Sequence, residues 1–325
     1  MSDLFSVIKE QVAGENVRIV LPEGNDARIV KAAVRLAEEK VVVPVLLGSK
    51  EDIEKTAKKI DVSVSGIEIH EPASDPLFDE LVQAFVERRK GKASEEDARK
   101  MLVDPNYFGT MLVFTGKADG LVSGAVHSTG DTVRPALQII KTKPGVSKVA
   151  GAMIMARAEE RYLFSDVAIN IAPTADDLAE NATVSAETAK IFGIDPRVAM
   201  LSFSTKGSAK SDETEKVVEA TKLAKEKAPD LILDGEFQFD AAFVPSVAAQ
   251  KAPGSVIKGD ANVFIFPSLE AGNIGYKIAQ RLGNFEAVGP ILQGLNAPVN
   301  DLSRGCNADD VYHLVLITAA QAISK

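Results

Sequence analysis

Two loop segments carry hydroxyl and charged side chains at spacings that suit anion binding and acid–base chemistry. The first, residues 127–132, reads His-Ser-Thr-Gly-Asp-Thr and stands between an apolar run and a helical pattern. A small, hydroxyl-rich loop that opens a helix can bind an anion, because its free N–H groups and the helix dipole favour negative charge. Arg134 would add a positive charge, and Pro135 suits an early helical position. Ordinary helix capping by Ser, Thr or Asp explains the same residues, and both readings stay open.

The second segment, residues 303–310, reads Ser-Arg-Gly-Cys-Asn-Ala-Asp-Asp and opens the last helical pattern. Asn307 can cap this helix with Asp310 at the third helical position, a variant of the capping box that by itself explains the aspartate. The functional alternative makes Asp310 a general base and Arg304 an electrostatic stabiliser. Cys306 is a tempting nucleophile, but a catalytic cysteine needs a base such as histidine beside it.

The sequence contains three histidines. His127 and His313 could assist Cys306 only if the fold brought one of them close. His313 lies within the apolar run 311–317, where a packed core histidine is the usual finding. His70 stands among glutamates and is expected at the surface. With so few histidines and no H-E-x-x-H or C-x-x-C motif, we expect no metal site.

Two further segments place cations where a phosphate-bearing ligand could bind. Residues 204–208 read Ser-Thr-Lys-Gly-Ser, again between a strand pattern and a helical pattern. They do not form a P-loop, yet Lys206 with its flanking hydroxyls could hold a phosphate. The basic run 88–92, with Arg99 and Lys100 beyond it, could meet a polyanion. The simpler interpretation is that residues 204–208 form a solvated turn and that the basic run is a solvated helix end.

The apolar pattern supplies the elements that must position these loops. Short β-rich runs alternate with helix-period segments along the chain, which predicts an α/β protein with mostly parallel sheets. The expected strands are 17–21, 41–47, 121–126, 149–155, 167–171, 198–203, 231–233 and 263–266.

A single sheet of this size would be large, so two α/β lobes are expected. Pro and Gly punctuate residues 141–145, which predicts a hinge there, and a second crossing is expected near Gly289-Pro290. The predicted first lobe comprises residues 1–144 with 290–325, and the second comprises residues 145–289.

Charge, cysteine content and termini restrict the class of protein. The chain of 325 residues has 37 Lys plus Arg and 46 Asp plus Glu, a net charge of −9. Such an acidic chain is a poor nucleic-acid binder, because phosphate backbones need a basic footprint. Its one cysteine excludes an intrachain disulfide and fits a reducing compartment. The start lacks a signal-peptide pattern and the apolar runs are shorter than a membrane span, so we expect a cytoplasmic protein without a membrane partner.

Five motifs in order resemble the phosphate acetyltransferase (phosphotransacetylase) family over the whole chain. They are the stretches 18–24, 127–135, 200–209, 270–277 and 298–305. The resemblance implies reversible acetyl transfer between acetyl-CoA and inorganic phosphate. It also implies a two-lobed α/β fold like that of isocitrate and isopropylmalate dehydrogenases, a homodimer, and an active site in the cleft between the lobes. CoA and acetyl-CoA would be substrates, and no tightly bound cofactor is expected.

The resemblance also implies roles for individual residues. Asp310 resembles the base for the CoA thiol, Ser303 its hydrogen-bonding partner near the thiol, and Arg304 the arginine that steadies the phosphate and the transition state. Arg89 and Arg134 resemble arginines that contact CoA phosphates. Arg88 is an alternative to Arg89, because Ala93 stands where a glycine is expected. The remaining substrate-binding residues that the motifs imply are Ser128, Thr129, Thr132, Ser204, Lys206, Asn273 and Tyr276.

The expected mechanism is direct attack of the CoA thiolate on the acetyl group in a ternary complex, with neither metal nor enzyme nucleophile. A ping-pong route through an acetylated Cys306 is the competing hypothesis. Phosphate butyryltransferase is the closest alternative activity. A non-catalytic regulatory module, such as those appended to malic enzymes, and a decarboxylating dehydrogenase on the same scaffold are alternatives from other classes. The absence of a G-x-G-x-x-G motif gives a Rossmann dinucleotide site no support.

Overall fold

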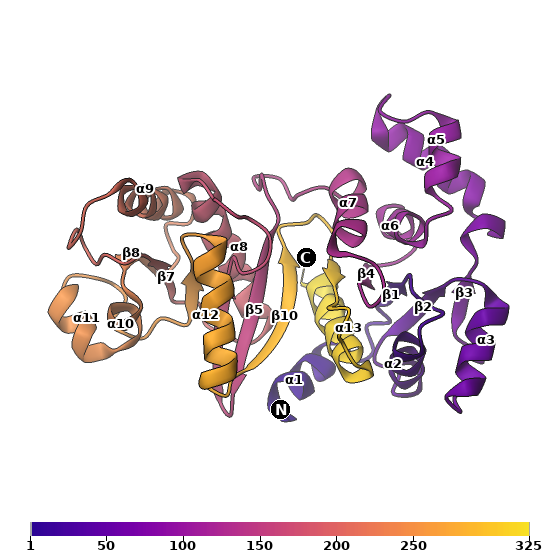
Figure 1. Cartoon of the computed structure of the whole chain (residues 1–325), viewed down its shortest axis with the longest axis horizontal. Helices are drawn as coiled ribbons and strands as arrows, with labels where there is room; N and C mark the ends of the chain where they lie inside the picture. The colour runs from indigo at the N-terminus through magenta and orange to yellow at the C-terminus, as the bar shows by residue number, and fades with distance from the viewer. Residues whose placement is uncertain (1, 325) are drawn as a thin grey trace. The chain divides into compact units, whose positions relative to one another are not determined.

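Two β-sheets, each covered by helices, organise the chain in the computed structural model, which describes residues 2–324 (Figure 1). One unit comprises Ser2–Thr142 together with the chain from Leu295 onward, and we call it the terminal unit. The other comprises Lys143–Gly294, and we call it the central unit. The chain therefore leaves the terminal unit after Thr142 and returns to it at Leu295.

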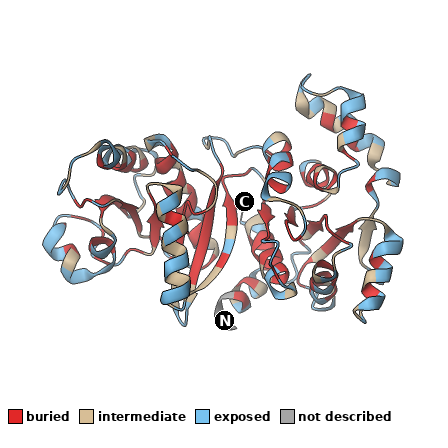
Figure 2. Ribbon diagram, viewed as in Figure 1, coloured by how far each residue is buried: buried red, intermediate tan, exposed pale blue. Residues whose placement is uncertain are grey.

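The sheet of the terminal unit has five parallel strands in the order β11-β4-β1-β2-β3. Their residues are largely buried, as expected for parallel strands with helices on both faces (Figure 2). The strands are β1 (Arg18–Leu21), β2 (Val43–Leu47), β3 (Glu68–His70), β4 (Gly120–Ser123) and β11 (Val299–Asp301).

Helices from both ends of the chain cover this sheet. The last helix, α13 (Ala308–Ile323), contacts β1, β4 and the helix α2 (Ala27–Glu38), and α1 (Ser2–Val12) packs on α13. A second group contacts the sheet through α6 (Pro105–Phe114), which touches β1 and β4 and packs on α4 (Phe78–Arg89) and α7 (Thr129–Ile139). The remaining elements are α3 (Lys50–Lys59), η1 (Pro72–Ser74) and α5 (Glu95–Met101).

The central unit contains a six-stranded mixed sheet in the order β10-β5-β6-β9-β7-β8. Strand β5 pairs antiparallel with both β10 and β6. Strands β6, β9, β7 and β8 pair in parallel. The strands are β5 (Ala150–Arg157), β6 (Glu160–Ser165), β7 (Val198–Leu201), β8 (Leu233–Phe237), β9 (Val263–Ile265) and β10 (Glu286–Gln293).

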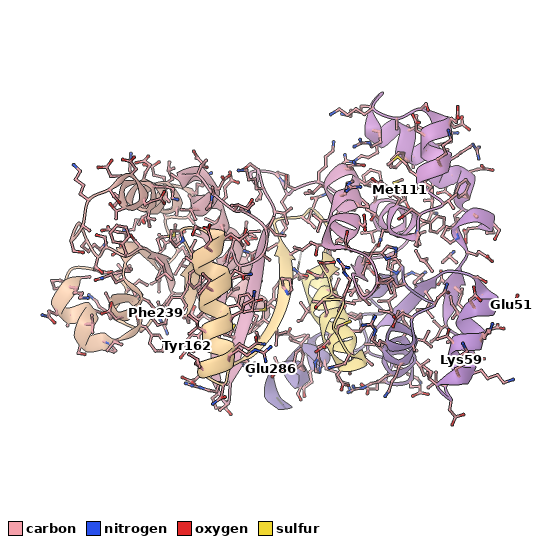
Figure 3. All side chains as sticks on the ribbon, viewed as in Figure 1. Glu51, Lys59, Met111, Tyr162, Phe239 and Glu286 are labelled. Atoms are coloured by element: carbon pink, nitrogen blue, oxygen red, sulfur yellow. The ribbon has the colours of Figure 1, made fainter. Side chains whose placement is uncertain are left out.

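Two groups of helices pack on this second sheet. The helices α8 (Ala175–Ile191) and α9 (Asp212–Lys227) contact each other and the parallel strands, and α12 (Leu269–Leu282) contacts β5, β6 and β10. Two short helices, α10 (Phe239–Phe243) and α11 (Pro245–Lys251), complete the unit. Aromatic rings fill part of the core: Tyr162 of β6 and Phe239 of α10 both pack on Phe264 of β9 (Figure 3).

The predicted α/β class is confirmed, but the strand expected at residues 167–171 is wrong. The apolar run 167–171 is a loop, because the Asp166 carboxylate accepts hydrogen bonds from the backbone N–H groups of Ala168, Ile169 and Asn170 and folds the chain there. The strand of this region is instead β6, which is too polar at its start to stand out. Gly289-Pro290 lies inside β10, and the chain returns to the terminal unit at Leu295, shortly after this strand ends.

Among the helices of residues 2–324, none combines the length and the apolar character that crossing a membrane requires.

Candidate active site

Three loops meet at the carboxyl edge of the terminal sheet. They follow β1, β4 and β11, which are neighbours in the sheet and run parallel. Parallel strands end at the same edge, and in open α/β sheets this edge is where ligands bind. The loops are residues 22–26, 124–128 and 302–307, and the last two contain the hydroxyl-rich and Ser-Arg-Gly motifs of the sequence.

The side chain of Arg28, in the first turn of α2, joins these three loops. Its Nη1 donates to the backbone carbonyls of Arg304 at 2.9 Å and Cys306 at 3.0 Å. Its Nη2 donates to the carbonyl of Ala125 at 2.8 Å and to the carboxylate of Asp26 at 2.8 Å. The hydrogen bonds that this guanidinium donates to the Asp26 carboxylate raise the pKa of Arg28 above its ordinary value. No sequence motif reveals this role of Arg28, because its backbone partners Arg304, Cys306 and Ala125 are distant in the chain.

The Ser303-Arg304-Gly305 turn and Asp310 are presented on the exposed side of this edge. The N–H of Cys306 donates to the carbonyl of Ser303 at 2.9 Å, which closes the turn. Asp310 Oδ2 accepts from the N–H of Asn307 at 2.8 Å, and Asn307 Oδ1 accepts from the N–H of Asp310 at 3.0 Å. The expected capping box of α13 is therefore present. It uses one carboxylate oxygen of Asp310, and the other has no hydrogen bond within residues 2–324.

Cys306 lies beneath this turn, with 7% of its surface exposed. Its Sγ is 3.7 Å from Arg28 Nη1. Burial raises the pKa of the Cys306 thiol, with a contribution from the negative charge of Asp310, against the opposing effect of Arg28. A buried thiol with a raised pKa is a poor nucleophile, because the thiolate is the reactive form.

The start of α7 presents the hydroxyl groups of the first sequence motif. Ser128 caps the helix and forms a capping box with Asp131. Thr129 Oγ1 donates to Asp301 Oδ2 at 2.6 Å, which ties α7 to the end of β11. Burial raises the pKa of Asp301. Thr132 is buried, and its hydroxyl, like that of Thr129, opposes this shift in the pKa of Asp301.

Glu23 supports the same loop from below. Its carboxylate accepts from the backbone N–H groups of Ala125, Val126 and His127, each at 2.8 Å. It also contacts His127 Nδ1 at 2.8 Å. Burial opposes ionisation of Glu23, but these hydrogen bonds outweigh it and lower its pKa. The hydrogen bond to Glu23 raises the pKa of His127.

The predicted CoA-binding arginines lie on α4 and α7. Arg88 is engaged with the end of α7: its Nε donates to the carbonyl of Ile139 at 2.6 Å and its Nη2 to that of Ile140 at 3.1 Å. Arg89 makes only one long contact, from Nη1 to the carbonyl of Gln138 at 3.5 Å. Its Nε is buried without a partner among the described residues. Arg134 is exposed on α7.

The charges of Arg89 and Arg134 both influence Tyr107 of α6. Burial raises the pKa of Tyr107, and the positive charges of both Arg134 and Arg89 oppose that shift. Both guanidinium groups therefore act on one phenol. Nearby, the charge of Arg88, with further contributions from its neighbours Lys90 and Lys92, lowers the pKa of Lys141. The ends of α4 and α7 thus form a concentrated patch of positive charge in an acidic chain.

The other four predicted substrate-binding residues belong to the central unit. Ser204 is buried and donates to Glu236 Oε1 at 2.8 Å. Lys206 Nζ donates to Asp234 Oδ1 at 2.8 Å and to the carbonyl of Gly235 at 2.6 Å. Lys225 contacts the same oxygen of Asp234 at 2.7 Å. Burial opposes the ionised form of Asp234, but the hydrogen bonds from the two lysines and Ser255 lower its pKa to about 2.

Asn273 and Tyr276 lie on α12. Asn273 Nδ2 donates to the carbonyl of Val167 at 3.0 Å, and its Oδ1 accepts from Lys277 at 2.7 Å. Tyr276 packs against the aromatic core, and burial raises its pKa. Nothing in these contacts links the two side chains directly to each other.

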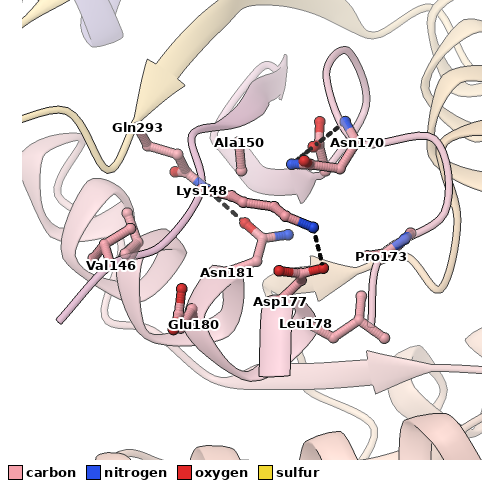
Figure 4. Close-up of a pocket in the computed structure, with 12 residues that line it drawn as sticks. Val146, Lys148, Ala150, Asn170, Pro173, Asp177, Leu178, Glu180, Asn181 and Gln293 are labelled. Carbon is pink, nitrogen blue, oxygen red and sulfur yellow. Dashed lines mark hydrogen bonds and ion pairs between the residues drawn. The ribbon is translucent and has the colours of Figure 1, made fainter. Parts of the chain in front are cut away.

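A polar cavity in the central unit is too small to hold a substrate (Figure 4). Its volume is about 10 Å³, the space of a single water molecule. Gln293 Nε2 donates to Asn181 Oδ1 at 2.9 Å at one side, and Lys148 pairs with Asp177 at 2.7 Å at the other. The oxygen of the Gln293 amide is buried without a partner among the described residues, so a bound water fits there.

The side chains of the other two histidines, His70 and His313, make structural contacts. His70 is mostly buried, contrary to expectation: its Nδ1 contacts Asp75 at 2.6 Å and its Nε2 contacts Glu68 at 2.7 Å. His313 stacks on Phe5 with ring centroids 3.7 Å apart. Within residues 2–324, no group of three or more His, Cys, Asp or Glu side chains is arranged to hold a metal ion.

Hydroxyl groups, helix N-termini and guanidinium groups at the carboxyl edge of a parallel sheet define an α/β enzyme that handles anionic substrates. The chain belongs to the family described as phosphate acetyl/butaryl transferase, whose model matches residues 3–319. The predicted family is therefore confirmed, and with it the prediction of an acyltransferase.

Individual relatives agree over the full length. The chain is 70% identical over 323 residues to the phosphate acetyltransferase of Bacillus subtilis (strain 168), covering 99% of this chain and 100% of the relative. It matches the crystal structure of a phosphotransacetylase from Streptococcus pyogenes with a TM-score of 0.98 and 59% identity, covering 100% of both chains.

A more distant match concerns the fold alone. A structure from Salmonella typhimurium assigned as a 4-hydroxythreonine-4-phosphate dehydrogenase matches with a TM-score of 0.54 and 15% identity, covering 95% of this chain and 99% of that one. The predicted dehydrogenase-like fold class is thus confirmed.

Proposed function

We propose that this chain is a phosphate acetyltransferase, which transfers an acetyl group reversibly between acetyl-CoA and inorganic phosphate. The observation that carries the proposal is the tie between Arg28 and the Ser303-Arg304-Gly305 turn, which fixes that turn beside the loop leading to α7. This edge combines a carboxylate, a guanidinium, hydroxyl groups and helix N-terminal amides. The carboxylate can accept a proton from a thiol, and the guanidinium, hydroxyl groups and amides can bind a negatively charged phosphate.

The proposed reaction is direct transfer between two bound substrates. A thiol with a pKa of about 8.5 is mostly protonated at neutral pH. Asp310 accepts the proton of the CoA thiol while the sulfur attacks the acetyl carbon, and Ser303 hydrogen-bonds near the sulfur. The C–S bond forms, the bond from the acetyl carbon to the phosphate oxygen breaks, and its electron pair leaves with phosphate. Arg304 stabilises the charge that develops on the carbonyl oxygen and the departing phosphate.

Helix α7 completes the proposed phosphate site. Ser128 and Thr129 stand at its N-terminus, where free N–H groups and the helix dipole favour a bound anion. Thr132 follows them in the first turns of α7 and is buried. The hydrogen bond from Thr129 to Asp301 holds the helix start against the end of β11, so that it is pre-positioned relative to the Ser303 turn.

We propose Arg89 and Arg134, rather than Arg88, as the contacts for CoA phosphates. Arg88 already donates to two carbonyls at the end of α7, whereas Arg89 has a single long contact. In the central unit, Asn273 and Tyr276 remain proposed substrate contacts. Ser204 and Lys206 are held by Glu236 and Asp234, so we assign them the role of shaping their loop.

Helix α12 offers a surface for a second copy of the chain. Ile274, Ile278 and Leu282 follow one another at every fourth position and are 57%, 54% and 80% exposed. Large apolar side chains gathered on one face of a helix mark an interaction surface. We propose that it forms a homodimer interface. We also place the protein in the cytoplasm, because its single unpaired cysteine suits a reducing compartment.

One assay tests the proposed activity. Release of free thiol is followed when the purified chain is given acetyl-CoA and inorganic phosphate, and acetyl phosphate is measured as the second product. Equimolar formation of the two supports the proposal. The same assay with butyryl-CoA tests the phosphate butyryltransferase alternative, which is favoured if kcat/KM is higher for the longer acyl group. No turnover with either substrate would overturn the assignment.

A further inference from the structure

We propose that His127, oriented by Glu23, binds a phosphoryl oxygen of acetyl phosphate or inorganic phosphate through its Nε2–H. This inference rests on the proposed function and adds one substrate contact to it. Neither residue was assigned to the reaction by the sequence motifs.

Glu23 is an anchored carboxylate. Its side chain is only 2% exposed, and it accepts hydrogen bonds from three consecutive N–H groups of the loop after β4. These three hydrogen bonds compensate for the burial of the carboxylate. The carboxylate makes a fourth contact, to Nδ1 of the His127 imidazole. A carboxylate beside Nδ1 places a proton on that nitrogen and fixes the orientation of the ring.

The opposite nitrogen of His127 is left open. Nε2 makes no hydrogen bond to any residue between 2 and 324, and the side chain is 28% exposed. The other two histidines differ, since both nitrogens of His70 contact carboxylates and His313 is stacked on Phe5. Among the described residues, His127 is thus the histidine with one ring nitrogen held by a carboxylate and the other free to bind a ligand.

His127 belongs to the loop that borders the proposed phosphate site. The preceding Ala125 is held by Arg28, which also holds the carbonyl of Arg304. The following residues, Ser128 and Thr129, begin α7. His127 therefore stands between the arginine turn and a helix N-terminus, two features that favour a bound anion.

The charges facing His127 support a protonated ring. Glu23 from the loop after β1, Asp104 before α6 and Asp131 of α7 all raise the pKa of His127, with Glu23 contributing most and burial opposing them. With Nδ1 directed to Glu23, protonation puts the second proton on Nε2. A charge-assisted hydrogen bond from an imidazolium to a phosphate oxygen is stronger than a neutral one. His127 keeps its proton during the reaction: the thiol proton goes to Asp310, and the hydrogen bond strengthens as negative charge collects on the departing phosphate.

The test uses His127→Gln, with His70→Gln as the matched control. His127→Gln removes the cation and leaves Asp310, Ser303 and Arg304 in place. We expect kcat/KM for acetyl phosphate to fall about 100-fold, with KM for CoA changed less than about twofold. The wild-type kcat/KM for acetyl phosphate should fall as pH rises and His127 loses its proton, and this alkaline limb should be absent in the variant. His70→Gln should keep both the rate and the pH profile.

A second measurement does not depend on turnover. The chain has three histidines, so their imidazole NMR signals can be followed individually while inorganic phosphate is added to the wild-type protein. We expect the signal of His127, assigned by elimination with His70→Gln and His313→Gln, to shift to a higher pKa as phosphate binds. An unresponsive His127, or an active His127→Gln with unchanged kinetics, would overturn the inference while leaving the proposed activity intact. An inactive wild-type protein would instead count against the proposed activity.

Discussion

Arg28 and Arg304 are 276 positions apart in the chain, yet the guanidinium of Arg28 donates to the backbone carbonyl of Arg304 at 2.9 Å. The bond leaves the side chain of Arg304 exposed while it fixes the backbone from which that side chain extends. One arginine thus positions another, and the turn that carries the proposed catalytic groups is held by a residue from a different loop.

Arg28→Lys should lower activity by positioning rather than by loss of a substrate contact. Lysine cannot reach Asp26, Ala125 and Arg304 together, because it lacks the planar fork of the guanidinium. We expect kcat to fall about 10- to 100-fold and the free energy of unfolding by about 1–3 kcal/mol. Steady-state kinetics and urea unfolding measure the two effects. Arg35→Lys, on the same helix and paired with exposed Glu39 and Asp309, should change neither by a comparable amount.

Asp310→Asn separates the capping role of this residue from its proposed role as a base. The asparagine amide oxygen can still accept the hydrogen bond from Asn307, so the start of α13 should remain intact. Loss of the base should lower kcat about 100-fold or more, with little change in KM. Asp309→Asn, at the adjacent position, serves as the control. A normal kcat in a folded Asp310→Asn protein would leave only the capping role.

Cys306→Ala should retain wild-type turnover within about twofold if acetyl transfer is direct, because removing a buried side chain that takes no part in bond formation leaves the reacting groups in place. In the wild type, burial and the raised pKa should make this thiol react slowly with a thiol reagent until urea unfolds the chain. Kinetics of the variant and the rate of labelling check both statements. Trapping of labelled acetyl on Cys306 would instead support the ping-pong route.

Asp234 should make the central unit sensitive to acid. Its pKa falls from 3.8 to about 2 in the folded chain, so its stabilising contribution is present above about pH 4 and is lost as pH falls toward 2. Asp234→Asn should therefore lower the free energy of unfolding by about 2 kcal/mol at pH 7. The difference from wild type should shrink as the pH is lowered. Asp240→Asn removes a carboxylate that is 51% exposed and pairs with Lys251, and it should cost less than about 1 kcal/mol at either pH.

Leu282→Glu should weaken a dimer that uses α12, because it places a charge on the most exposed apolar position of the stripe. Light scattering over a range of concentrations should show a shift from dimer to monomer. Val218→Glu changes an exposed apolar residue on α9 and should leave the mass unchanged. A wild-type protein that is monomeric at every concentration would contradict the proposed interface.

Local features of the fold and site could be predicted from the sequence, and long-range ones could not. The capping boxes at Ser128 and Asn307 depend on residues three positions apart, so their pattern is visible in the chain. The ties from Glu23 to His127 and from Arg28 to Arg304 join residues about one hundred or more positions apart. They follow from strand order, which single-sequence periodicity does not specify.

The errors in the element predictions have the same origin. The run 167–171 has strand-like composition, but the buried Asp166 carboxylate offers its N–H groups closer partners than a neighbouring strand would. His70 was expected at the surface because its neighbours in sequence are acidic. Glu68 and Asp75 pair with its two ring nitrogens, and the His70 side chain is only 15% exposed. In both cases hydrogen bonds to carboxylates determine the local structure, and hydropathy alone does not reveal such bonds.

The terminal unit is assembled from both ends of the chain, whereas the central unit is one continuous stretch. During synthesis, the central unit has all its strands available before β11 and α13 have been made. The terminal sheet must wait for β11 to pair with β4 and for α13 to cover β1 and β4. Because Ser303, Arg304 and Asp310 arrive with that last segment, a nascent chain stays without its proposed catalytic groups until the segment closing the sheet is present. Completion of the fold and onset of activity are therefore expected to coincide.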